Sequence, residues 1–394
     1  MYGLELAGEE DVFAAYEAKS AAAGVELVAP GLATAGSITD RVETLAYTRS
    51  AIELIGRTDA DVASARALLQ AAPIEREGTV AVRARDVRGS ADISTQQAER
   101  ELGTVLVDRG FTVDLEEPDH LLRVLFSAGV VDADEVAIGA IPDVVGETVD
   151  VCLVGWQAAE STRDFTGRKP TDRPFFQPGS MAPIDARAYA NVAGAGAGRL
   201  VVDPMCGTGG LLLEAGLVGA RLLGVDAQEK MVRGAKQNLE AYLPDHLEFG
   251  VVRGDATALP LCDPDGSESP TAFSLAAGSG AVAAGSGAVD AGSAPVDVGS
   301  GAVDAVVFDA PYGRQSKIAR HELAELVEGA LAEARRVCRS DGRAVLVADR
   351  SWRNAAVSAG FEVDAVFRRP VHRSLDRYVH VLTGTVGSGA ELSP

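Results

Sequence analysis

One stretch decides the fold: Val306–Val307–Phe308–Asp309–Ala310–Pro311–Tyr312–Gly313–Arg314. A short apolar run rich in Val and Phe and bounded by turn residues is typical of a buried strand in a parallel sheet. Ligands of open α/β sheets bind beyond the carboxyl ends of such strands, so residues 309–312 are expected at the edge of a site. A carboxylate, a rigid proline and an aromatic ring suit a planar base with an exocyclic amine, although an ordinary strand-to-loop turn has the same composition.

Around this stretch, strands and helices alternate from Arg199 onward. The apolar runs predict strands at 200–203, 222–226, 249–252, 303–308 and 344–347, and helices at 211–217, 230–242 and 318–338. The runs 361–367 and 378–382 are expected to close the set as an antiparallel edge pair. The alternation predicts an α/β class with a doubly wound sheet.

Acidic residues follow four of these strands: Asp203, Asp226, Asp255 and Asp309. After the first strand comes Asp203–Pro204–Met205–Cys206–Gly207–Thr208–Gly209–Gly210, which lacks the full Gly-x-Gly-x-x-Gly spacing and the Walker lysine. Asp226 is placed to accept hydrogen bonds from ribose hydroxyls, and Asp255 from an adenine amine. Acids in register without a phosphate-binding loop indicate S-adenosylmethionine rather than NAD, although each acid alone is more often a cap or turn residue.

Asp309–Ala310–Pro311–Tyr312 resembles the Asp-Pro-Pro-Tyr motif of class I methyltransferases that act on exocyclic amines of bases, with Ala310 in place of the first proline. Together with Pro178–Gly179–Ser180–Met181, the glycine motif and His372–Arg373–Ser374–Leu375, it is similar to the archaeal tRNA (guanine(10)-N2)-dimethyltransferase family. The resemblance implies that the Asp309 carboxylate and the Ala310 carbonyl hold the guanine amine, that Pro311 fixes the turn, and that Tyr312 stacks on a flipped base. The cofactor residues it implies are Asp203, Cys206, Gly207, Gly209, Asp226, Asp255 and Ala256.

The N-terminal part reads as α+β. Residues 2–6 and 25–28 are expected strands on either side of a helix at 9–24; residues 80–85 and 121–126 are expected strands, with a helix at 94–109. Arg83, Arg85 and the segment Val113–Asp119 resemble a THUMP domain, an RNA-binding module of tRNA-modifying enzymes. The generic alternative is an α+β domain with solvated arginines.

The predicted organisation is a small α+β cap at 1–44, a THUMP domain at 45–155, a linker at 156–177 and a methyltransferase domain at 178–388. Residues 263–301 carry Gly- and Ser-rich seven-residue copies and are expected to be a flexible insertion. The expected contacts with substrate RNA are Arg83, Arg85, Arg168, Lys169, Arg314, His372 and Arg373. For the linker cations a solvated hinge is the alternative, and for His372 and Arg373 a structural role.

The composition favours a cytoplasmic enzyme. The net charge is −21 with only five lysines, as expected of a haloarchaeal-type surface in concentrated salt, where a Debye length of about 3 Å screens self-repulsion. Four scattered cysteines indicate a reducing cytosol and no metal site, and the chain has no apolar run that predicts a membrane span. The expected partner is tRNA, with no DNA and a monomeric chain. An rRNA guanine or DNA adenine methyltransferase and a non-catalytic RNA-binding protein with this fold are the alternatives.

Overall fold

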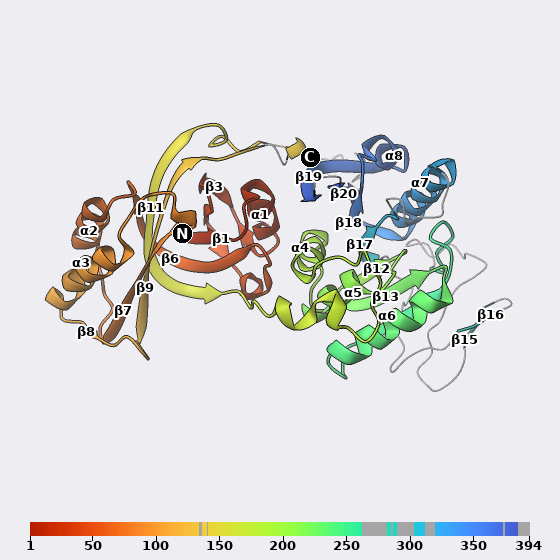
Figure 1. Cartoon of the computed structure of the whole chain (residues 1–394), viewed down its shortest axis with the longest axis horizontal. Coiled ribbons are helices and arrows are strands. Elements are labelled where there is room, and N and C mark those ends of the chain that lie inside the picture. The colour runs from red at the N-terminus through yellow and green to blue at the C-terminus, as the bar shows by residue number, and fades with distance from the viewer. Residues whose placement is uncertain are drawn as a thin grey trace, which may run out of the picture. The chain divides into compact units, whose positions relative to one another are not determined.

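The computed structural model describes residues 1–133, 136–139, 141–261, 282–284, 287–289, 303–311, 320–372 and 375–384. The chain forms two compact units, which we describe separately (Figure 1). Unit 1 comprises Met1–Glu135 and Ala140–Arg163, and unit 2 comprises Val136–Gly139 and Asp164–Pro394. Among the helices of the described residues, none is both long enough and apolar enough to cross a membrane.

Unit 1 is built on an eight-stranded sheet with the order β3-β4-β1-β6-β11-β9-β7-β8. The strands are β1 Tyr2–Leu6, β3 Glu26–Ala29, β4 Leu32–Ala35, β6 Thr48–Thr58, β7 Thr79–Asp86, β8 Thr112–Val113, β9 His120–Val130 and β11 Thr148–Glu160. β6 pairs with β1 on one side and with β11 on the other. The strands of the predicted cap therefore share one sheet with those of the predicted domain at 45–155. So small a cap buries its apolar side chains against the larger sheet because it is too short to enclose a core alone.

The helices of unit 1 are α1 Asp11–Ala18, α2 Val62–Ala71 and α3 Thr95–Asp108, with short elements η1 Asp40–Thr44, η2 Val87–Gly89, β2 Ala22–Ala23 and β5 Ser37–Ile38. α3 begins after Ser94, whose Oγ accepts a hydrogen bond from the Gln97 N–H at 3.3 Å. Leu102 and Leu106 are fully buried, which confirms the predicted helix and its apolar stripe. The helix predicted at 9–24 ends at Ala18, because residues 22–23 pair with β5 instead.

Unit 2 contains a second eight-stranded sheet, ordered β10-β19-β20-β18-β17-β12-β13-β14. Its strands are β10 Val136–Ile138, β12 Leu200–Asp203, β13 Arg221–Asp226, β14 Phe249–Arg253, β17 Val303–Asp309, β18 Cys338–Ala348, β19 Phe361–His372 and β20 Leu375–Gly384. The central strands β12, β13, β14, β17 and β18 are parallel, whereas β20 is antiparallel to both β18 and β19. The predicted α/β class and the antiparallel pairing of the last two strands are confirmed, but the pair is not the edge of the sheet, because β10 pairs with the outer side of β19.

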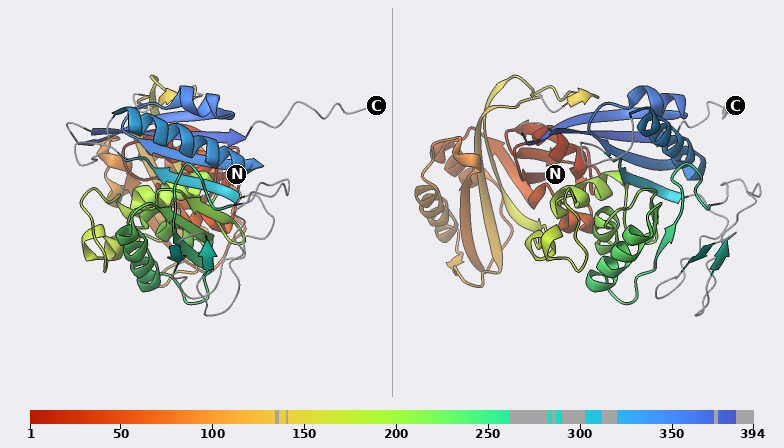
Figure 2. Two further views of the ribbon diagram at one scale, coloured as in Figure 1. Left: turned by 90° about the vertical axis from the view of Figure 1, so that its right-hand side faces the viewer. Right: turned by 45° about the vertical axis from the view of Figure 1, so that its right-hand side comes forward.

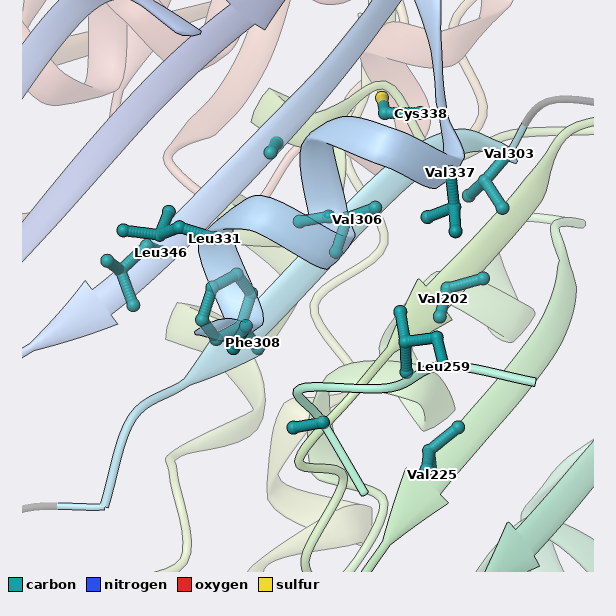
Figure 3. Packing of buried hydrophobic residues seen from close by; sticks show 14 of the residues in the cluster. Val202, Val225, Leu259, Val303, Val306, Phe308, Leu331, Val337, Cys338 and Leu346 are labelled. Atoms are coloured by element: carbon teal, nitrogen blue, oxygen red, sulfur yellow. The ribbon is translucent and has the colours of Figure 1, made fainter. Parts of the chain in front are cut away.

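Helices cover both faces of this sheet: α4 Pro183–Ala193, α5 Gly210–Leu217, α6 Glu229–Tyr242, α7 Arg320–Val337 and α8 Arg353–Ser358. Leu331 of α7 packs with Phe308 and Leu346 on one face (Figure 3). α5 lies on the other face, where a Cβ added to Gly216 would come within 2.9 Å of the Leu222 side chain. Figure 2 shows α7 (blue) and the green helices on opposite sides of β17 (cyan).

The predicted insertion at 263–301 lies mostly outside the described residues. Within it, the structure describes an antiparallel pair, β15 Val282–Ala284 and β16 Gly287–Val289. In the sequence, the insertion falls between β14, at one edge of the sheet, and β17, which pairs with β12 and β18.

Candidate active site

Three acids stand at the carboxyl ends of neighbouring parallel strands: Asp203 on β12, Asp226 on β13 and Asp309 on β17. The chain builds β12, β13 and β14 in one direction and then returns to place β17 on the other side of β12. Ligands of such sheets bind at this switch point, because the loops leave β12 and β17 toward opposite faces and open a crevice between them. The structure therefore brings these carboxylates to one edge of the sheet.

The environment of these acids is strongly negative. Burial raises the pKa of Asp203 well above its ordinary value, and the neighbouring carboxylates of Asp226 and Asp309 raise it further. Burial also raises the pKa of Asp226, against the opposing effect of hydrogen bonds from the N–H groups of Gln228 and Gly207. A cationic ligand at this edge would stabilise the ionised acids, so the site is suited to a positively charged molecule.

The loop after β12 is held against β13 by two hydrogen bonds. The Cys206 N–H donates to the Val225 carbonyl at 2.9 Å, and the Gly207 N–H donates to Oδ2 of Asp226 at 3.0 Å. Gly207 and Gly209 have φ of +52° and +76°, and a Cβ at Gly209 would come within 3.2 Å of Ala235. Glycine is needed at both positions because other residues are strained in the left-handed region.

A cavity of about 190 Å³ opens over this loop. Its lining comes from the loop, from the strand-end acids, from α5 and α6, and from the segment preceding α4. The lining residues are Gln177, Pro178, Gly179, Ser180, Met181, Asp203, Met205, Cys206, Gly207, Thr208, Gly210, Leu211, Met231 and Asp309. Asp309 and the glycine loop thus face one space across the switch point.

The predicted cofactor residues do not all reach this cavity. Asp203, Cys206 and Gly207 line it, whereas Asp226 holds the loop from beneath. Asp255 is exposed beyond the end of β14, where its Oδ1 accepts hydrogen bonds from Thr257 N and Oγ1, both at 2.8 Å. Ala256 is buried in the hydrophobic core under α7. The cavity as described therefore stops short of the residues predicted to meet the adenine ring.

The predicted catalytic turn is described only in part. Asp309 is half-buried, and the Ala310 N–H donates to the Val347 carbonyl at 2.8 Å, so β17 continues to pair with β18 at this residue. This bond fixes the backbone at the point where the Ala310 carbonyl is predicted to act. Tyr312, Arg314 and Arg373 lie outside the described residues, as does the side chain of His372 at the end of β19.

The predicted linker at 156–177 is divided between the units: residues 156–160 are the end of β11, residues 161–163 also belong to unit 1, and residues 164–177 belong to unit 2. We call residues 164–181 the strap. Phe175 lies on α6, where a Cβ added to Gly234 would fall 2.0 Å from its ring. Asn238, fully buried on α6, donates to the carbonyls of Phe175 and Thr208 at 2.9 Å each, and its Oδ1 accepts from the Phe175 N–H at 2.9 Å. One side chain thereby ties the strap, α6 and the glycine loop together.

Asn238 is a residue that the sequence patterns did not single out. One feature of the sequence could have indicated it: Asn238 is a polar residue on the apolar face of a helix. Gly234, Ala235 and Leu239 of that face are buried. Such an amide must find buried partners, which here belong to segments 30 and 63 positions away in the sequence.

Arg168 was predicted to contact RNA, and the structure places it elsewhere. Its side chain is 7% exposed, and its guanidinium makes two hydrogen bonds to the buried Glu214 of α5, Nε to Oε1 at 2.9 Å and Nη2 to Oε2 at 3.1 Å. Arg187 of α4 reaches the same carboxylate at 2.8 Å. Arg168 therefore fastens the strap, because a guanidinium that is only 7% exposed and makes two hydrogen bonds to one carboxylate is not accessible to a phosphate. Lys169 is exposed.

The two predicted arginines of unit 1 are both partly exposed on β7. Nη2 of Arg83 donates to the Leu115 carbonyl at 2.8 Å, and Nη1 of Arg85 pairs with Oε1 of Glu5 at 2.8 Å. Two residues apart on one strand, they face the same side of the sheet.

We expect Asn238→Ala to weaken binding of the predicted cofactor about tenfold or more. The substitution leaves two carbonyls and one N–H without their partner and releases the glycine loop from the strap. Titration calorimetry with S-adenosylmethionine measures the effect, and a thermal melt separates it from unfolding. Asn354→Ala, at an exposed position of α8, is the matched control. Binding by the Asn238 variant within twofold of wild type would contradict the assigned role.

The chain is similar to known methyltransferases. A family model described as RMKL-like, methyltransferase domain (UPF0020) matches residues 170–267. The tRNA (guanine(10)-N2)-dimethyltransferase of Methanothermobacter thermautotrophicus is 29% identical over 341 residues, which are 86% of this chain and 83% of the relative. The protein of the same name from Pyrococcus abyssi is 27% identical over 307 residues, 78% of this chain and 74% of the relative. A crystal structure of TrmN from Thermus thermophilus covers 98% of this chain and 100% of its own at 21% identity, with a TM-score of 0.42.

Proposed function

We propose that this chain, a class I methyltransferase that uses S-adenosylmethionine and a homologue of these archaeal proteins, methylates the exocyclic N2 of a guanosine in tRNA. The observation that carries the proposal is the shared cavity: Asp309 faces the glycine loop across the switch point of the sheet. The names of the relatives extend the proposal to guanosine 10 and to two successive methyl additions.

The residues at this edge fit the cofactor. S-adenosylmethionine supplies a methyl group activated on a positively charged sulfonium. The buried Asp203 and the partly buried Asp226 favour a cation, and the glycine loop offers backbone without side chains that would obstruct the approach. We assign Asp203, Cys206, Gly207 and Gly209 to the wall of the pocket and Asp226 to the ribose hydroxyls. Asp255 and Ala256 remain our assignment for the adenine.

Asp309 and Ala310 are assigned to the guanine amine. The N2 lone pair is delocalised into the ring and is a weak nucleophile. Two acceptors, the Asp309 carboxylate and the Ala310 carbonyl, would take the two N2–H groups and favour pyramidal nitrogen, which aims the lone pair at the methyl group. Ala310 stands where the Asp-Pro-Pro-Tyr motif has its first proline. The hydrogen bond from its N–H to the Val347 carbonyl holds this part of the backbone, and with it the Ala310 carbonyl, in place. Pro311 would limit the turn, and Tyr312 would stack on the flipped base.

Unit 1 is assigned to RNA. Residues 45–155 form our proposed THUMP region, and Arg83 and Arg85 are its proposed contacts, with Lys169, Arg314, His372 and Arg373 contributing from unit 2. We propose that the protein acts as a cytoplasmic monomer in a halophilic cell. A net charge of −21 makes nonspecific attraction to DNA small, so the RNA contacts must come from close, shaped arginine sites.

A methyl-transfer assay tests the function. The full chain is incubated with labelled S-adenosylmethionine and an unmodified tRNA transcript, and the nucleosides are then separated. We expect N2-methylguanosine followed by N2,N2-dimethylguanosine, and loss of both when guanosine 10 is replaced by adenosine. Label on another nucleoside, or on rRNA but not tRNA, would overturn the assignment of the substrate.

A further inference from the structure

We infer that unit 1 carries a phosphate-binding site formed by Arg49, Arg85 and Arg123 around Glu5, and that this site takes a backbone phosphate of the RNA substrate. The inference deepens the proposed function and rests on it for the identity of the RNA. Of these residues, the sequence patterns singled out only Arg85.

Three strands send arginines to one buried carboxylate on β1. Glu5 has a side chain that is 1% exposed. Nη1 of Arg85, on β7, lies 2.8 Å from its Oε1, and Nη2 of Arg123, on β9, lies 2.9 Å from its Oε2. Nε of Arg49, on β6, stands 3.9 Å from Oε1. Ser50 adds a hydroxyl at 3.3 Å from Oε2. The cluster joins residues up to 118 positions apart in the sequence.

The cluster carries more positive charge than its carboxylate can neutralise. Three guanidinium groups against one carboxylate leave a local excess of two positive charges in a chain whose net charge is −21. The acid is buried, whereas the side chains of Arg49, Arg85 and Arg123 are 39%, 43% and 20% exposed. The negative partner is therefore withdrawn from solvent, and the cationic side of the cluster remains accessible to an anion.

Donors remain for such an anion. A guanidinium has five N–H donors, and one carboxylate with two oxygens cannot accept from three of these groups in full. Oε1 of Glu5 accepts no hydrogen bond among the described residues, so Arg49 and Arg85 approach it as ion-pair partners without aligned hydrogen bonds. A fourth cation lies close by: the pKa of Arg163 is lowered first by burial and then by the charge of Arg49, while the carboxylates of Glu17 and Glu5 oppose this shift.

Phosphate is the anion that matches this arrangement. Guanidinium forks bind phosphate oxygens in pairs, and arginines already oriented by Glu5 would lose little side-chain freedom on binding. Site geometry of this kind also tolerates concentrated salt better than a diffuse basic patch, because partly buried charges are screened less than exposed ones. An acidic protein can hold RNA through such a site despite its overall charge.

The test compares Arg85→Gln and Arg123→Gln with Arg66→Gln in the full chain. Arg66 lies on α2, half-exposed, with Glu101 at 3.8 Å, so its replacement makes the same charge change elsewhere in unit 1. Fluorescence anisotropy measures the Kd of an unmodified tRNA transcript at several KCl concentrations. We expect each site variant to bind about tenfold more weakly and the plot of log K against log [KCl] to lose about one unit of slope. Arg66→Gln should match wild type.

Steady-state kinetics and melting curves separate the possible failures. The KM for tRNA should rise while kcat and the Kd for S-adenosylmethionine stay the same. If Arg123→Gln melts early, Arg49→Gln, at the most weakly held arginine, replaces it. Site variants that bind tRNA like Arg66→Gln would overturn the inference, whatever the enzyme methylates. A wild-type enzyme that methylates no guanosine, with the binding differences intact, would instead overturn the proposed function alone.

Discussion

We expect Asp309→Asn to lower the rate of methyl transfer about a thousandfold and to leave the affinity for S-adenosylmethionine within a few-fold of wild type. The amide keeps the shape of the carboxylate but replaces one acceptor oxygen with a donor, which repels an N2–H group and removes the negative charge. Loss of one aligned electrostatic contact costs about 10²–10³ in kcat, and misplacement of the amine adds to this. Single-turnover transfer to tRNA, with cofactor binding measured by calorimetry, checks both parts.

Asp349→Asn is the matched control for this experiment. Asp349 follows β18, the strand next to β17, and its carboxylate pairs with Arg350 at 2.9 Å. Asp349→Asn removes the same charge as Asp309→Asn, but Asp349 does not line the cavity. The control variant should therefore keep normal activity. If Asp309→Asn retained more than a tenth of the wild-type rate, the carboxylate would not be the acceptor of the amine.

We expect Glu214→Ala to destabilise unit 2 by about 3–5 kcal/mol. The substitution removes the carboxylate shared by Arg168 and Arg187, and it leaves Arg168 with only the 55% exposed Asp164, at 2.7 Å, as its carboxylate partner among these contacts. Urea unfolding, followed by the fluorescence of Trp352 in unit 2, measures the loss. Because the charges are buried, most of the effect should persist at 2 M KCl.

A surface pair provides the comparison for Glu214. Glu248 lies 3.0 Å from Arg221, with side chains 45% and 34% exposed, and Glu248→Ala should cost less than about 1 kcal/mol. A Glu214 variant as stable as the Glu248 variant would mean that water or chain movement compensates the buried arginines. The strap would then be less firmly fastened than the contacts indicate.

The sheet of unit 2 could be predicted from the sequence because each central strand is a short apolar run ended by a turn or an acid. The buried side of β17 and the apolar stripe of α7 were both visible in the sequence, and their side chains, such as Phe308 and Leu331, pack in the same core. β6 and β11 of unit 1 escaped prediction. Both strands are interrupted by register shifts where they pair, at Val154/Gly155 and at Gln157/Ala159, and these shifts break the simple alternation by which a strand is recognised.

The sequence predicts the position of a site residue when that residue directly follows a strand. It does not predict a contact between side chains that are far apart in the sequence. Asp203, Asp226 and Asp309 follow from the register of parallel strands. Arg168 and Asn238 do not, because a local pattern cannot show that a basic, proline-containing segment turns back to pair with Glu214 and with α6. The same local pattern assigns Asp255 to the adenine, and a local pattern cannot show that Oδ1 of this residue also accepts a hydrogen bond from the Thr257 N–H of its own turn.

The strap also determines where a separate segment containing unit 2 has to begin. A gene segment that starts at Pro178, the first residue of the Pro178–Met181 motif, would lack Arg168 and Phe175. The buried side chains of Glu214 and Asn238 would then lose these partners. A segment that starts at Asp164 keeps both anchors, although it still lacks β10, the partner of β19 that comes from an earlier part of the chain. Replacing unit 1 by another domain therefore requires a boundary that lies before the strap.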